Sequence, residues 1–145
     1  MAETLGSLCD KLTIVKIKQF HVEDNVKISS LLTQEKQLIE EIDCYISDAV
    51  DGVIPLEKIT FASNKVFKEK GNETREFSGD IGDIFSELSN INCTLWHEQE
   101  KVYDFESVPV KEKNIVVKKL AILNLERNKC IDEINRQFHQ LLNKS

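Results

Sequence analysis

The sequence predicts an all-α protein, a single helical domain built as a four-helix bundle. Only two prolines and five glycines interrupt 145 residues, which leaves room for long helices. Apolar residues recur at helical spacing along most of the chain. The one β-branched run, at residues 115–117, lies inside a helical pattern that continues past it, so we expect no strand.

Two stretches, 12–24 and 88–104, also match each other, and each is followed by a second helical run. The aligned residues are Leu12 with Leu88, Thr13 with Ser89, Phe20 with Trp96, His21 with His97, Asp24 with Glu100 and, further on, Ile39 with Ile131. We therefore interpret the chain as an internal duplication of a helical hairpin. Hairpin 1 is expected at about 3–50, a short helical insert at about 51–79, and hairpin 2 at about 80–143.

The first hairpin is predicted from its apolar spacing. A helix over about 3–24 has one apolar face made by Leu5, Leu8, Leu12, Val15 and Val22. A second helix over about 25–50 repeats the pattern with Ile28, Leu31, Leu38, Ile42 and Ile46. It ends at Asp51 and Gly52, because glycine commonly follows the last helical residue.

In the insert, Pro55 suits the first turn of a short helix, and Leu56, Ile59 and Val66 suit its buried side. Residues 73–79 are polar and predict a loop. The third helix is expected over about 80–104. Ser107 and Pro109 then begin a fourth helix that reaches Leu142 and either breaks near Glu112 or overhangs its partners.

Composition and charge exclude several classes of function. The net charge is −6 with both signs mixed along the chain, whereas binding of nucleic acid needs a concentrated basic face. No run of eighteen apolar residues is present, so we expect no membrane insertion. The opening residues lack the regions of a secretory signal and the four cysteines are widely spaced, which favours a cytoplasmic location.

The first candidate site is a polar stripe that the duplication places on equivalent faces of two helices: His21, Asp24, Cys93, His97 and Glu100. Each histidine precedes a carboxylate by three residues, one helical turn away. If the two faces meet, His21, His97, Asp24 and Glu100 could hold a divalent metal. The alternative is an ion pair or hydrogen bond between each histidine and its carboxylate, near each helix end, and no cofactor is predicted. Cys93, one turn before His97, is either an activated thiol or an ordinary buried cysteine.

Two further candidates come from charged residues. Glu35, Glu40, Glu41 and Asp43 are either magnesium ligands, as in all-α nucleotide pyrophosphatases, or a solvated face. Glu35 and Arg127 interrupt apolar stripes at equivalent positions with opposite charges, which predicts a buried ion pair between them. In that case Asn124 and Asn128 would complete the hydrogen bonds of Arg127; otherwise both charges extend to the stripe's edge.

Three motifs resemble small, uncharacterised bacterial helical proteins often encoded beside surface-polysaccharide genes. The first is 8–18, which is similar to L-x-D-K-L-T-I-L-x-I-K, although Cys9 departs from the aliphatic residue expected there. The others are 92–99, which is similar to N-x-x-L-W-x-x-E although its last residue is Gln99, and 123–135, which is similar to L-N-x-x-R-x-x-x-I-x-x-I-N. The resemblance implies a helical fold and a link to surface polysaccharide, not a reaction.

The sequence therefore favours a non-enzymatic interaction or accessory protein that binds a protein partner or associates with itself. A dimer is favoured because Ile115, Ile122 and Leu125 lie off the main apolar stripe of the fourth helix and need cover, from the insert or a second subunit. The alternative function is a metal-dependent hydrolase that acts on a small phosphorylated or nucleotide substrate through the histidine stripe.

Overall fold

The computed structural model describes residues 3–59 and 70–144 and confirms the all-α prediction. The four long helices are α1 (Leu5–His21), α2 (Asn25–Val50), α3 (Ile81–Tyr103) and α4 (Val110–Asn143). Two short 3-10 helices, η1 (Leu56–Lys58) and η2 (Phe105–Ser107), lie in the connections. No strand occurs in these two ranges.

The ends of the helices are set by side chains that cap them. Thr4 accepts a hydrogen bond from the amide of Ser7 and begins α1. Asp24 accepts from the amides of Val26 and Lys27 and begins α2, so the first helix ends at His21, three residues earlier than expected. Asp80 and Asp83 form a capping box at the start of α3.

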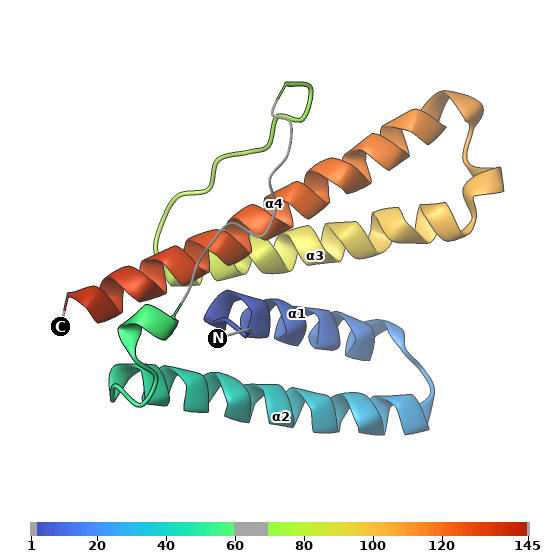
Figure 1. The fold of residues 1–145 in the computed structure, drawn as a ribbon. Helices are drawn as coiled ribbons and strands as arrows, with labels where there is room; N and C mark the ends of the chain where they lie inside the picture. Colours follow the sequence, from blue (N-terminus) through green and yellow to red (C-terminus); the bar gives the residue numbers. More distant parts are fainter. Residues whose placement is uncertain (1–2, 60–69, 145) are drawn as a thin grey trace.

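The fourth helix is continuous over its 34 residues, so the break considered near Glu112 is absent. At about 1.5 Å per residue it is about 51 Å long. Figure 1 shows the consequence: the end of α3, the η2 turn and the first turns of α4 extend beyond the turn that joins α1 to α2. The overhang predicted from the length of this helix is therefore present.

Of the insert the structure describes residues 51–59 and 70–79, and within these ranges the helical part is the 3-10 turn η1, which begins directly after Pro55. Ile59 at the end of this turn is buried in the core, as predicted, whereas Val66 lies outside the described residues. Residues 73–79 form a loop, as their polar composition indicates.

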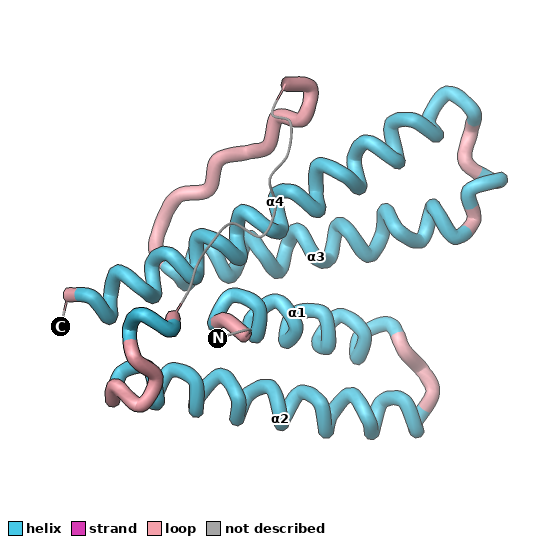
Figure 2. The backbone as a smooth tube through the Cα atoms, in the orientation of Figure 1, coloured by secondary structure: helices cyan, strands magenta, loops and turns pink. Residues whose placement is uncertain are grey.

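The two hairpins run side by side, and α1 lies between α2 and the α3–α4 pair (Figures 1 and 2). Accordingly α1 packs on all three other long helices, whereas α2 packs chiefly on α1. The core between them is apolar, and its fully buried side chains are Ile84, Leu88, Ile91, Cys130 and Ile134.

Gly6 lets α1 approach α4 closely. A Cβ atom at this position would lie 2.5 Å from the backbone oxygen of Ile131. The amide of Gly6 donates a hydrogen bond of 2.7 Å to Oδ1 of Asn135, whose Nδ2 in turn donates to Oγ1 of Thr4. The start of α1 is therefore fixed to α4 by polar contacts as well as by packing.

Candidate functional site

The two histidines of the predicted stripe do come together. The rings of His21 on α1 and His97 on α3 are 5.8 Å apart between centroids and nearly perpendicular, at 84°. His21 also stacks on Trp96, with 4.9 Å between centroids and 11° between planes. Both histidines are exposed, so the three rings form a surface cluster that joins the ends of α1 and α3.

The two carboxylates of the stripe are engaged elsewhere, which corrects the proposed four-ligand metal site. Asp24 caps α2 through Val26 and Lys27, and Glu100 accepts a hydrogen bond of 2.8 Å from Nε1 of Trp96. In the described part of the chain, no group of three or more His, Cys, Asp or Glu side chains is placed to hold a metal ion. Both contacts are local, but the partners are backbone amides and a tryptophan, not the histidines that the local alternative placed one turn before each carboxylate.

An apolar groove of about 520 Å³ opens beside the histidine cluster. Its lining comes from α1, α2 and α3 and includes Leu12, Ile17, Phe20, His21, Glu35, Phe85, Cys93 and His97. Phe20 is 87% exposed, which is unusual for a phenylalanine, because burial of the ring would be favourable. Cys93 is exposed on this lining, not buried, so the groove combines an apolar floor with two imidazoles and a thiol.

The other thiols differ in exposure. Cys9 and Cys130 are buried, and burial raises the pKa of each to about 12. These two thiols stay protonated near neutral pH and behave as small apolar side chains. Cys44 is exposed on α2.

The predicted ion pair between Glu35 and Arg127 is wrong. Arg127 donates to Asp10 instead, from Nε to Oδ1 at 2.8 Å and from a terminal nitrogen to Oδ2 at 2.5 Å. Glu35 lies on the other side of α1, where Lys16 and Gln19 each donate to it at 2.8 Å. Because α1 lies between α2 and α4, Glu35 on α2 and Arg127 on α4 each pair with side chains of α1 and not with each other.

Asp10, which is only 5% exposed, is the centre of a buried polar network that the sequence did not predict. Asn92 on α3 donates from Nδ2 to Oδ1 of Asp10 at 3.0 Å and to Oγ1 of Thr13 at 2.6 Å. Arg127 on α4 completes the network. Its hydrogen bond to Asp10 raises the pKa of the Arg127 guanidinium above the ordinary value. One carboxylate thus joins α1, α3 and α4.

A signal for this network was present in the sequence. Asp10, Thr13, Asn92 and Arg127 are among the polar letters of the three motifs quoted above, which also include lysine, glutamate and further asparagine positions. Asn124 and Asn128, expected to assist Arg127, donate instead to carbonyls one turn earlier in α4. The network around Arg127 is instead made by Asp10 on α1 and Asn92 on α3.

The acidic candidates on α2 do not converge. Glu40, Glu41 and Asp43 are exposed, and Glu35 is held by Lys16, which lowers the pKa of Glu35. Glu40, Glu41 and Asp43 therefore lie on a solvated face, as the alternative interpretation held, whereas Glu35 lies in the lining of the groove.

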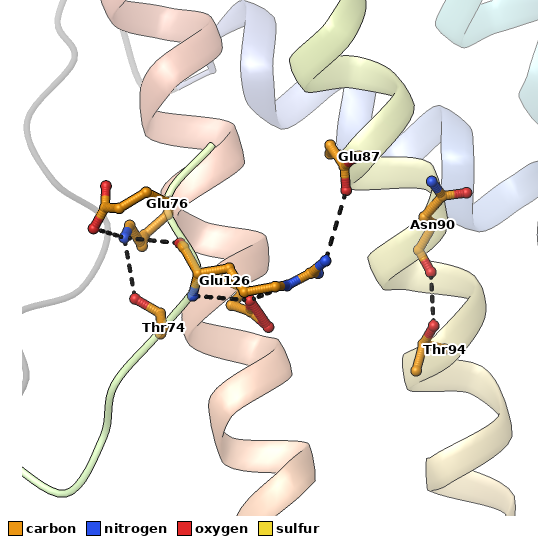
Figure 3. Close-up of polar contacts among 8 residues, drawn as sticks. Thr74, Glu76, Glu87, Asn90, Thr94 and Glu126 are labelled. Atoms are coloured by element: carbon orange, nitrogen blue, oxygen red, sulfur yellow. Dashed lines mark hydrogen bonds and ion pairs between the residues drawn. The ribbon is translucent and has the colours of Figure 1, made fainter. Parts of the chain in front are cut away.

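A second buried carboxylate fixes the 70–79 loop to α4. Glu126 has a side chain only 5% exposed, and Arg75 donates to it from Nε at 2.7 Å and from its backbone amide at 3.2 Å. Figure 3 shows the loop running along α4 beside Glu126, with Thr74 and Glu76 next to it. Lys129 contacts both of these side chains and the carbonyl of Arg75.

Comparison of the chain with protein-family models, with curated proteins and with solved structures finds no match. Among the described residues, no helix is both long enough and apolar enough to cross a membrane.

Proposed function

We propose that this chain is a non-enzymatic interaction or accessory protein whose groove between α1 and α3 binds an apolar segment of a partner protein. The observation that carries the proposal is the exposure of Phe20, 87%, at the edge of an apolar groove. Contiguous exposed apolar surface marks sites where a protein binds a partner or a ligand. Trp96, His21 and Phe20 add ring surface at its edge, and aromatic residues are enriched in protein interfaces.

The biological setting of the proposal rests on the resemblance of the three motifs to bacterial proteins encoded beside surface-polysaccharide genes. We infer that the partner belongs to the synthesis of such polysaccharides and that both proteins are cytoplasmic. The unpaired state of all four cysteines supports this location, since thiols stay reduced there.

The experiment that tests the proposal places a photoreactive phenylalanine analogue at position 20 in living cells. Tyr103, an equally exposed aromatic at 83% that does not line the groove, is the matched control position. We expect one protein adduct at position 20 that is absent at position 103. The adduct should also disappear when Ile17→Asp places a charge in the groove. An adduct that forms equally from both positions, or that survives Ile17→Asp, would contradict the proposal.

The metal-dependent hydrolase remains the second candidate, because His21 and His97 do lie together beside an open groove. Two imidazoles can bind Zn²⁺, and a hydrolase keeps further positions for water and substrate. Titration of the purified protein with Zn²⁺ separates the two functions. Tight stoichiometric binding lost in His21→Ala and His97→Ala, but kept in the control His139→Ala, would favour the hydrolase. Weak binding that is equal in all variants would favour the interaction protein.

A further inference from the structure

Helix α2 carries two apolar lines, and only one of them is covered. The line Leu31, Leu38 and Tyr45 repeats every seven residues, with Leu31 and Tyr45 buried and Leu38 packed against the hydrophobic core. The line Leu32, Ile39 and Ile46 follows one residue later with the same spacing. Its members are 54%, 44% and 36% exposed. One residue corresponds to about 100° around a helix, so the second line lies on a separate side of α2.

A helix with two apolar sides is expected to contact two neighbours. Within this chain α2 packs chiefly on α1, and Figure 1 shows α2 at the edge of the molecule. Spacing of seven residues is the pattern of a helix–helix seam, because it keeps the same side toward a partner helix. The exposed line is therefore built to pack against another helix.

We propose that this helix is the α2 of a second copy, packed antiparallel about a two-fold axis at Ile39. In that register Leu32 faces the partner's Ile46, and Ile39 faces the partner's Ile39. The line extends at both ends with half-buried Ile28 opposite the partner's Val50, which is 65% exposed. From 28 to 50 the seam is about 33 Å long at about 1.5 Å per residue.

The charges beside the seam select the antiparallel direction and a copy of the same chain. Lys36 precedes Ile39 by three residues and Asp43 follows it by four, and both are exposed on the same side of the seam. Antiparallel pairing places Lys36 beside the partner's Asp43, twice by symmetry. In parallel pairing the same flank of the two helices lies on opposite sides of the seam, so Lys36 and Asp43 would not meet across it. The seam is thus complementary to itself in only one direction.

The proposed dimer interface lies on α2, whereas the sequence favoured an interface on the fourth helix. Of the off-stripe residues on α4, Leu125 is buried within the chain and only Ile115 remains clearly exposed. The uncovered apolar line lies on α2 instead. This inference does not depend on the groove between α1 and α3, since none of Leu32, Ile39 and Ile46 lines it.

Sedimentation equilibrium over about 1–100 μM tests the dimer, since a single helix seam is small compared with a standard interface. Leu32→Glu should weaken association at least about tenfold, because it buries a charge in the seam. Val117→Glu on α4 is the matched control, since Val117 is also 54% exposed, and it should leave association unchanged. A monomer at every concentration, or association lost in Val117→Glu and kept in Leu32→Glu, would overturn the proposal.

Disulfide cross-linking tests the direction in a background with Cys44→Ser and Cys93→Ser, which removes the exposed thiols. Under mild oxidation Ile39→Cys should form a covalent dimer, because position 39 meets itself across the axis. Leu32→Cys should form one only in combination with Ile46→Cys. Equal cross-linking of Leu32→Cys alone would indicate parallel packing and overturn the antiparallel register.

Discussion

The guanidinium group of Arg127 on α4 spans both carboxylate oxygens of Asp10 on α1. The side chain of Asp10 is 8% exposed and that of Arg127 is 29% exposed. Asn92 on α3 donates to the same carboxylate, so one buried anion holds three helices in register. The stability of the bundle should therefore depend on this contact more than on any surface ion pair.

Replacement of Arg127 tests this dependence. Arg127→Met leaves the Asp10 carboxylate buried without its cation, which should cost about 3 kcal/mol in the free energy of unfolding. Arg136→Met is the control, since Arg136 pairs with Glu133 one turn away at the surface and should cost under about 1 kcal/mol. Urea melts of the two variants give both values, and equal losses would contradict the role assigned to Arg127.

Double-mutant cycles identify the partner of Arg127. Asp10→Ala with Arg127→Ala should destabilise much less than the sum of the single changes, because the two side chains contact each other. Glu35→Ala with Arg127→Ala should be additive, since Glu35 pairs with Lys16. Strong coupling in the second cycle would restore the pair expected from the sequence.

Replacement of two helical glycines by alanine tests how closely α1 approaches α4. Gly82→Ala on α3 adds a methyl group in open space and should stabilise the protein by up to about 1 kcal/mol through helix propensity. Gly6→Ala places its methyl group 2.5 Å from the carbonyl oxygen of Ile131 and should destabilise by about 1–3 kcal/mol. Stabilisation by both changes in thermal melts would show that α1 does not approach α4 this closely.

The helices could be predicted from the sequence because their signals are local. Apolar spacing and the Asp51–Gly52 stop gave α2 its observed bounds, and α3 and α4 begin within a few residues of their expected positions. The aligned aromatic–histidine steps indicated that His21 and His97 would be neighbours if the two helix faces met, and the two rings do lie together. Local pattern was sufficient for the helices and their approximate bounds.

The partners of the buried charges could not be predicted in the same way. A charge in an apolar stripe indicates that a partner exists, but the rotation of each helix decides which residue it meets. Asp10 on α1 contacts Asn92 on α3 and Arg127 on α4, and the spacing of residues within each helix does not indicate that these three would meet. The contact between Arg75 and Glu126 joins an irregular loop to a helix, and no periodic pattern reports such a contact.

Hydrogen exchange tests the attachment of the 70–79 loop. Glu126→Gln removes the charged acceptor of both the side chain and the amide of Arg75, so the amides of residues 74–77 should exchange faster. Glu76→Gln is the control, because the side chain of Glu76 is 91% exposed and its bond to Lys129 lies at the surface. Unchanged exchange in Glu126→Gln would show that Glu126 does not fix the loop.

The pH dependence of stability should report on Glu98, whose pKa is lowered from 4.5, first by a hydrogen bond from Lys119. The side chain of Glu98 is 7% exposed and lies 2.9 Å from Nζ of Lys119. A lowered folded-state pKa contributes stability that is present above the unfolded-state pKa and lost as the pH falls through the folded-state value. Urea melts from pH 7 to 3 should therefore fall less steeply for Glu98→Gln and Lys119→Met than for the natural chain. Identical slopes would contradict this assignment.

The interaction function itself is tested most directly by the affinity of the purified chain for the protein recovered in the adduct at position 20. Calorimetric titration of the natural chain, Phe20→Asp and Tyr103→Asp gives three dissociation constants. If the partner binds in the groove, it covers the ring of Phe20. Phe20→Asp should then weaken the affinity at least about tenfold, since the loss of an aromatic side chain buried in an interface costs more than about 1.4 kcal/mol. Tyr103→Asp should bind as the natural chain does. Equal affinity in all three proteins would show that the groove is not the binding site.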